Sequence, residues 1–235
     1  MSERFFTEKL GNGLMVVGEE LPEAESAAVV MMLPVGSVSD PSGREGSANV
    51  LFDMLQKGAG NLGVRELSQA FEDHGIQRGC GSGTEAGVVS ASMLAEKLPR
   101  AIELIGDMVL RPQLPAEELD SIRELVLQDL SALEDEPASK VMVELASHYY
   151  PSPWGRSQLG TVESVNALSI EDLRSYHSSR FVPAQSVLAV AGKFEWSEVI
   201  RCAEAQFGKW SGRVDMVSAP VLSKTSKYSH VKKET

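Results

Sequence analysis

Two kinds of hydrophobic spacing run along the chain, and together they predict an α+β fold. Alternating or continuous apolar runs of strand length lie at residues 5–10, 14–17, 27–33, 88–94 and 187–192. Apolar residues spaced three and four apart, as on an amphipathic helix, lie at residues 46–57, 67–75, 96–110, 115–134, 137–150, 168–176 and 197–207. Hairpins followed by pairs of helices favour an antiparallel sheet with helices packed on one face.

Turn and cap residues mark where several of these elements begin or end. Asn12-Gly13 suits the tight turn of a hairpin, because both residue types tolerate a positive φ. Pro115 suits the first turn of a helix, and Ser169 and Ser197 suit helix N-caps. The glycine-rich residues 79–86 are expected to form a turn between two strands.

The same glycine-rich segment predicts neither a nucleotide site nor a serine-hydrolase site. Gly81-x-Gly83-x-x-Ala86 resembles part of a dinucleotide fingerprint, but residues 88–93 alternate like a strand, whereas the fingerprint opens a helix. Ser82 lacks the glycines at both flanking offsets that a hydrolase nucleophile elbow needs. We therefore expect no cofactor loop and no serine nucleophile in this segment.

Residues 46–58 form the most informative segment of the chain. Each residue of a helix advances by about 100°, so Asn49 and Asp53 share one face, one turn apart. Phe52 lies at the shoulder of that face. Two short polar side chains at positions i and i+4 have the spacing of a helical metal site.

This segment resembles the signature helix of the pitrilysin/insulinase family of zinc metallopeptidases. That family carries the inverted motif H-x-x-E-H, in which the histidines bind zinc and the glutamate is the general base. In this chain the histidine positions correspond to Asn49 and Asp53, and the glutamate position corresponds to Phe52. The third zinc ligand of the family, a glutamate on a later helix, matches Asp129.

Further segments extend the resemblance over most of the chain. Residues 153–156 and 159–163 match the family pattern P-x-G followed by L-G-T-x-E. Residues 181–192 resemble its Y-x-P-x-N-x-x-L-x-V-x-G strand, and Phe207-Gly208-Lys209-Trp210 closes the pattern. The order and spacing of these segments imply the metallohydrolase fold of processing peptidases, in which helices pack on one face of an antiparallel sheet.

The departures from the motif imply a site that has lost its zinc chemistry. A catalytic zinc takes imidazole, thiolate and carboxylate ligands, and the hydrolytic base must accept a proton from water, which Phe52 cannot do. We therefore expect no metal, no other cofactor and no catalysis in this chain on its own. The alternative is a weak oxygen site for a hard cation, made of Asn49, Asp53 and Asp129.

The resemblance implies a non-catalytic subunit that shapes a peptide-binding chamber together with a zinc-bearing peptidase partner of the same family. Two alternatives remain: a structural core subunit of a larger assembly, and a metallopeptidase with an altered metal site. The aromatic residues at 148–150 and Trp154 are expected to pack in the core, although the resemblance places this segment near the substrate chamber.

Charge and cysteine content restrict the partners and the compartment. The net charge of −11 is spread along the helices, which argues against nucleic acid and anionic membranes as partners. No apolar stretch is long enough to span a bilayer, and the N-terminus lacks a secretory pattern, so we expect a cytoplasmic protein unless a signal was removed. Cys80 and Cys202 are expected to be free, buried thiols.

The histidines do not have the spacing of zinc ligands and are expected at the surface or at helix ends: His74, His148, His177 and His230. Residues 1–212 are expected to form one N-terminal peptidase-like domain. Residues 213–235 then form a linker and, from Tyr228, the first strand of a second half. Because complete chains of the family hold two such halves, we expect this chain to be the N-terminal half of a longer protein.

Overall fold

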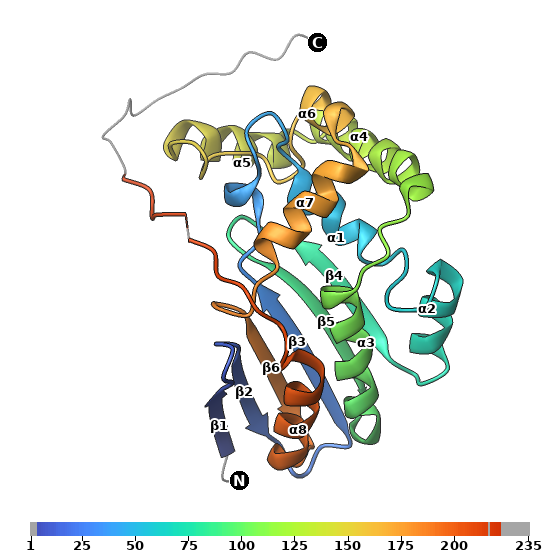
Figure 1. Cartoon of the computed structure of the whole chain (residues 1–235). Helices are drawn as coiled ribbons and strands as arrows, with labels where there is room; N and C mark the ends of the chain where they lie inside the picture. The colour runs from blue at the N-terminus through green and yellow to red at the C-terminus, as the bar shows by residue number, and fades with distance from the viewer. Residues whose placement is uncertain (1–3, 216, 222–235) are drawn as a thin grey trace.

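The computed structural model describes residues 4–215 and 217–221, and a six-stranded sheet forms its centre (Figure 1). The strand order across the sheet is β1-β2-β6-β3-β5-β4. The strands are β1 (Arg4–Lys9), β2 (Met15–Glu20), β3 (Ser26–Leu33), β4 (Gln77–Ser82), β5 (Gly87–Leu94) and β6 (Val187–Gly192). The strand expected from Tyr228 lies outside the described residues.

The sheet confirms the α+β prediction but is mixed rather than purely antiparallel. β6 inserts between β2 and β3, parallel to β2 and antiparallel to β3. The other neighbouring strands pair antiparallel, and Lys9 faces Met15 across the hairpin turn at Asn12-Gly13. A parallel pairing needs a long crossover connection, which residues 21–186 provide.

Helices account for most of the remaining described chain. The short 3₁₀ helices are η1 (Ser37–Ser39), η2 (Ala95–Lys97) and η3 (Ala116–Glu118). The α-helices are α1 (Ser47–Met54), α2 (Val64–Glu72), α3 (Leu98–Leu110), α4 (Leu119–Asp135), α5 (Pro137–Tyr149), α6 (Val162–Ala167), α7 (Ile170–Arg180) and α8 (Trp196–Phe207). Every helix expected from the hydrophobic spacing is present.

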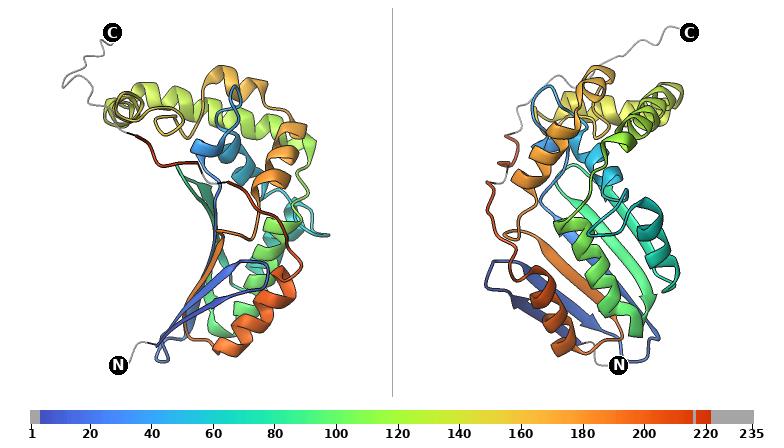
Figure 2. Two further views of the ribbon diagram at one scale, coloured as in Figure 1. Left: turned by 60° about the vertical axis from the view of Figure 1, so that its left-hand side comes forward. Right: turned by 45° about the vertical axis from the view of Figure 1, so that its right-hand side comes forward.

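Helices cover one face of the sheet and leave the other face open. Figure 2 shows α3 and α8 lying along the covered face. Along β3 the side chains of Val29, Met31 and Leu33 point into the helical layer and are fully buried. Met32, which points the other way, is 45% exposed. This two-sided pattern follows from the period-two alternation of a strand, and it places the main core between the sheet and its helices.

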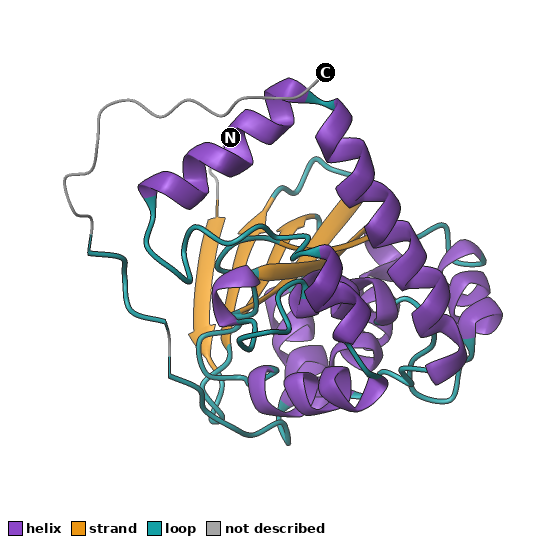
Figure 3. Ribbon diagram, turned by 90° about the horizontal axis from the view of Figure 1, so that it is seen from above, coloured by secondary structure: helices purple, strands orange, loops and turns teal. Residues whose placement is uncertain are grey.

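The two consecutive helices α4 and α5 lie at one end of the molecule beyond the strands (Figures 1 and 2), and Figure 3 views the molecule from that end. α4 contributes Leu119, Ile122 and Val126 to the core. α5 contributes no buried residue, so it projects from the body of the fold. Within the described residues, no helix is both long and apolar enough to cross a membrane.

Two local predictions were wrong. Gly79 and Gly81 lie inside β4 rather than in a turn, because β4 is an edge strand, where glycine is tolerated; the turn follows at residues 83–86. Ser197 lies inside the first turn of α8, whose N-cap is Glu195. α8 therefore begins at Trp196, whose ring stacks on that of Phe6 with the ring centroids 5.0 Å apart.

Candidate functional site

The N-terminus of α1 is anchored by a buried carboxylate. Asp40 accepts hydrogen bonds from the backbone N–H groups of Gly46 and Ala48, at 2.8 and 2.9 Å. Amides at the start of a helix have no partner within it, and negative charge is favourable there. Burial raises the pKa of Asp40 to about 6, although both hydrogen bonds and the charge of Arg156 act to lower it.

Gly46 lets the chain enter α1 at the required angle. Its φ of 91° lies in the left-handed region, and a Cβ at this position would lie 2.7 Å from the carbonyl oxygen of Leu159. Together with Asp40, this close contact sets the position and direction of α1. The side chains of Asn49, Phe52 and Asp53 are placed accordingly.

Phe52, at the general-base position of the motif, is part of the core. Its side chain is fully buried, and a Cβ at Gly87 would lie 2.0 Å from its ring, so the ring lies directly over that glycine of β5. The ring of Phe181 lies 5.9 Å away, centroid to centroid. The phenyl group therefore fills an apolar position of the core, and it can neither accept a proton nor hydrogen-bond water.

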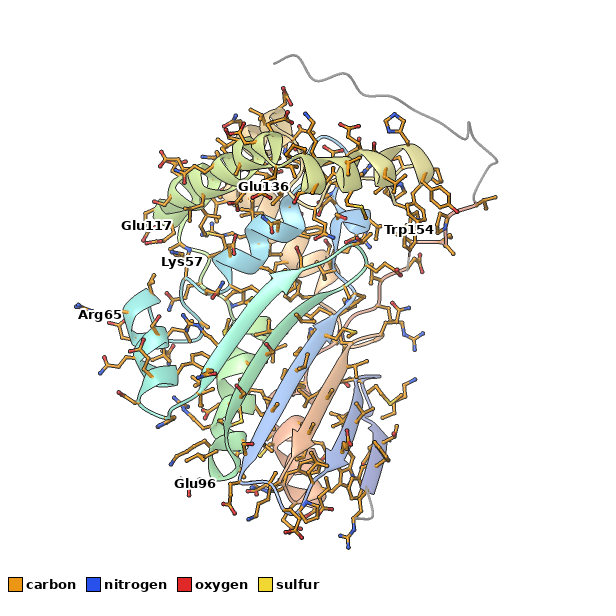
Figure 4. All side chains as sticks on the ribbon, turned by 180° about the vertical axis from the view of Figure 1, so that it is seen from behind. Lys57, Arg65, Glu96, Glu117, Glu136 and Trp154 are labelled. Carbon is orange, nitrogen blue, oxygen red and sulfur yellow. The ribbon has the colours of Figure 1, made fainter. Side chains whose placement is uncertain are left out.

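Asn49 and Asp53 lie one turn apart on α1 and are half-buried, whereas Asp129 on α4 is exposed. Burial raises the pKa of Asp53, the negative charge of Asp129 raises it further, and the charge of Lys57 lowers it. The structure thus brings Asp53 and Asp129 within electrostatic reach of each other. Lys57, labelled in Figure 4, forms an ion pair of 3.0 Å with Glu118, which joins the end of α1 to the start of α4.

Cys80 of β4 is a further residue beside this group. Its thiol donates a hydrogen bond to the carbonyl oxygen of Phe52, with Sγ and O 3.1 Å apart. Burial, and secondly the charge of Asp53, raises the pKa of the thiol to about 12. A thiol with such a pKa stays protonated at neutral pH, so Cys80 is not a thiolate nucleophile in this environment. Cys80 and Cys202 are both free and half-buried.

The donor set of this site does not fit a catalytic zinc ion. The three motif positions offer an amide, a phenyl ring and a carboxylate, whereas a catalytic zinc site takes at least two of its three protein ligands from histidine or cysteine. Across the described residues, His, Cys, Asp and Glu side chains do not gather in threes in a way that could hold a metal ion. Two carboxylates and an amide oxygen are donors for a hard cation. That alternative and the expected absence of metal both stay predictions.

Sequence comparison decides the family. The family described as insulinase (peptidase family M16) matches residues 15–162. The chain belongs to the insulinase family of peptidases. A second M16 description, the peptidase M16 inactive domain, matches residues 167–235. The resemblance seen in the signature helix is thereby confirmed.

The M16 relatives are longer than this chain. An uncharacterised zinc protease of Mycobacterium leprae is 30% identical over 200 residues, which is 85% of this chain and 45% of the relative. A probable mitochondrial-processing peptidase subunit beta of Schizosaccharomyces pombe is 26% identical over 214 residues, 90% of this chain and 47% of the relative. The chain thus spans about half the length of the relatives it matches.

Solved structures of the family share the fold. A crystal structure titled as a peptidase M16 inactive domain from Pseudomonas fluorescens matches with a TM-score of 0.85 at 22% identity, covering 93% of this chain and 54% of that one. Pitrilysin matches with a TM-score of 0.82 at 18% identity, covering 95% of this chain and 25% of that one. The expected M16 fold is confirmed.

Sequence reasoning located α1 and Asp129 but missed Asp40 and Cys80. Asp40 lies in a loop six residues before Gly46, the N-cap of α1, and Cys80 comes close to Phe52 only through the packing of β4 against α1. His177, expected at a surface or helix end, lies in the last turn of α7 and is half-buried. Burial lowers its pKa, and Nε2 lies 2.9 Å from the carbonyl oxygen of Val109. His230 lies outside the described residues.

Proposed function

We propose that this chain is a non-catalytic M16 unit that shapes a peptide-binding chamber with a zinc-bearing peptidase partner of the same family. One observation carries the proposal: the general-base position is filled by Phe52, which is fully buried against Gly87. Because neither histidine position carries a histidine, this chain on its own lacks the groups that hydrolysis by zinc requires. Zinc in the assembly then belongs to the partner.

The sheet supports a role in holding extended peptide. β4 is an edge strand, so one side of its backbone has no strand partner among the described residues. An extended peptide can add to such an edge through main-chain hydrogen bonds. Phe52 and Asp53 lie next to this edge, because the Cys80 thiol of β4 bonds the Phe52 carbonyl. A peptide added to β4 would therefore run past the degenerate site.

The surface of α5 supports a partner. Val141, Met142, Leu145 and Tyr149 lie on one face of this helix, and all are between 50% and 63% exposed. Tyr149 and Tyr150 are also exposed, so the expectation of core packing was wrong for them. The M16 relatives are about twice as long as this chain, and we assign this face to contact with the zinc-bearing peptidase partner.

The test measures bound metal and cleavage of an unfolded peptide, first with the purified chain and then with an added M16 protein that carries H-x-x-E-H and comes from the same organism. We expect no stoichiometric metal and no cleavage by the chain alone. Added to the partner, the chain should form a complex and raise the partner's cleavage rate. A homo-oligomer without effect on the partner would favour the structural-core alternative instead.

An altered metal site would give a different result. Near-stoichiometric metal and chelator-sensitive cleavage by the chain alone, both lost in Asp53→Ala, would overturn the proposal. Asp73→Ala is the matched control, because Asp73 is an exposed carboxylate at the end of α2.

The edge-strand step has its own test. Hydrogen exchange of the chain with and without an excess of unfolded peptide should show new protection in β4. β1, the opposite edge of the sheet, is the internal control and should not change. Equal protection of both edges, or of neither, would contradict binding at β4.

A further inference from the structure

A polar pocket separate from the signature helix face lies between the η1 loop, the segment after α5 and one side of α7. Its volume is about 510 Å³. Residues of α7 spaced about one helical turn apart form one wall of the pocket, among them Asp172, Ser175 and Ser179. The rest of the wall comes from the loop before α1 and from residues 153–156. Its charged residues are Asp40, Arg44, Arg156, Asp172 and Arg180. Three guanidinium groups therefore face two carboxylates.

Both carboxylates are already engaged by the protein. Asp40 accepts the two backbone N–H groups at the start of α1. Asp172 accepts hydrogen bonds from the backbone N–H and the hydroxyl of Ser169, at 2.9 and 2.8 Å, and from Nε of Arg44 at 2.9 Å. Asp172 is thus paired with Arg44, and Asp40 interacts with the charge of Arg156, so neither carboxylate pairs with Arg180.

Arg180 differs from the other two arginines of the pocket. Among the residues that the structure describes, its guanidinium forms no ion pair and no hydrogen bond. It borders the large pocket and also a smaller hollow lined by Glu85 and Asp215, but it pairs with neither acid. Arg156 is only partly engaged: Nη1 donates to the carbonyl oxygen of Asp40 at 2.8 Å, and Nη2 lies 3.9 Å from Glu45.

Hydroxyl groups complete the polar wall. Ser175 and Ser179 lie on α7 one turn apart, on the side that lines the pocket with Arg180. The hydroxyl of Ser175 has no hydrogen-bond partner among the described residues, so it is free to donate. A guanidinium fork beside a free hydroxyl is a donor set for an oxyanion.

We propose that this pocket binds a small oxyanion, a carboxylate or phosphate group, through Arg180 and Arg156 with Ser175 as an additional donor. The net charge of the whole chain is −11, so long-range attraction of anions does not explain binding here; the local donors have to supply it. The bound carboxylate or phosphate group is the anionic end of a larger molecule, or a free ion, that fits the pocket. This site is independent of the proposed peptidase partner.

The experiment titrates the purified chain by calorimetry with inorganic phosphate and with one short peptide in two forms, with a free C-terminal carboxylate and with a C-terminal amide. We expect saturable binding of phosphate or of the free-carboxylate peptide, and none of the amide. Sodium chloride at matched ionic strength should not reproduce it. The probe that saturates identifies the source of the oxyanion.

Variants connect binding to the pocket. Arg180→Gln should weaken binding by about tenfold or more, because it removes charge-assisted hydrogen bonds, and Ser175→Ala should weaken it less. Arg174→Gln is the matched control, since Arg174 is an arginine of the same helix outside the pocket wall. It should leave the affinity unchanged.

Two results would overturn the oxyanion site: no saturable binding of any probe to the folded chain, or binding that Arg180→Gln leaves intact. Circular dichroism of each variant shows that the chain is folded. Because no partner takes part, failure here would not affect the proposed function, and failure of the partner experiment would not affect this site.

Discussion

Phe52 and Gly87 depend on each other, because the ring occupies the position that any Cβ at residue 87 would need. The pair ties α1 to β5 and fixes the height of α1 over the sheet. A buried aromatic ring contributes through its large apolar area and its dense packing. The stability of α1 therefore depends on the residue at the general-base position of the family motif.

Phe52→Ala should lower the free energy of unfolding by about 3–5 kcal/mol, because it removes a fully buried ring and leaves a cavity. Urea denaturation followed by circular dichroism measures this change. Phe5→Ala is the control: Phe5 is 68% exposed, so its removal should change stability by less than about 1 kcal/mol. Equal losses in the two variants would show that Phe52 is not a core residue.

Asp40 makes stability depend on pH. Burial raises its pKa from 3.8 to about 6, so the folded state binds the proton more tightly than the unfolded state. The stability due to this group is complete below about pH 4 and is lost as the pH rises through about 6. The shift of about two pH units corresponds to a loss of about 3 kcal/mol.

Asp40→Asn removes this titration. Between about pH 4 and pH 7, the wild type should lose about 3 kcal/mol of unfolding free energy relative to the variant. Urea denaturation of both proteins at both pH values measures the difference. Asp73→Asn, at an exposed position, should show no such change. A constant gap between wild type and Asp40→Asn would contradict the raised pKa.

Single residues were the least predictable level of this structure. The pattern placed Asn49, Phe52 and Asp53 on one helix correctly, since helical spacing is local. It placed Phe52 at the shoulder of the polar face, whereas the ring is in the core. Burial of Phe52 depends on β5, which lies more than a full helix and strand further along the chain, and local spacing carries no such information.

The elements followed the sequence more closely, because caps and turns are local. Ser169 accepts the backbone N–H of Asp172, and the Asp172 carboxylate accepts the backbone N–H of Ser169, as in the expected capping box. Ser197 is also a serine near the start of a helix, but it is not the N-cap of α8. The aromatic contact of Trp196 with Phe6 joins α8 to β1, and these residues are far apart in sequence.

Ser169→Ala should therefore destabilise the protein by about 1 kcal/mol, the usual loss for an N-cap serine. Thermal unfolding at fixed pH measures it. Ser178→Ala is the control on the same helix: Ser178 is exposed and its hydroxyl donates only to the carbonyl of Ser175. Equal losses of stability in the two variants would show that the N-cap hydrogen bond of Ser169 does not stabilise α7.

At the level of the whole molecule, the helical layer covers one face of the sheet and leaves the other face and α5 uncovered. The α+β class followed from the order of hairpins and helices. The parallel pairing of β2 with β6 did not, because it joins residues separated by most of the chain. The division into residues 1–212 and 213–235 stays a prediction.

Met142→Asp should separate stability from association. Met142 is 63% exposed, so the substitution should change the free energy of unfolding by about 0.5 kcal/mol or less. Affinity for the peptidase partner should fall by about tenfold or more, because a charge would enter the apolar contact. Ser147→Asp, on the opposite side of α5, should leave the affinity unchanged. Sedimentation velocity measures the affinity of both variants for the partner. An unaffected complex in Met142→Asp would rule out α5 as the contact.

The contact of Phe52 with Gly87 also sets the order in which this chain could acquire the H-x-x-E-H motif. Histidines at positions 49 and 53 would replace half-buried residues and come first at little cost. Glutamate at position 52 would put an unpaired charge into a closed apolar space, so that step would come last and only after the strand below had shifted. The evolutionary path would therefore pass through a protein that binds metal before one that cleaves peptides.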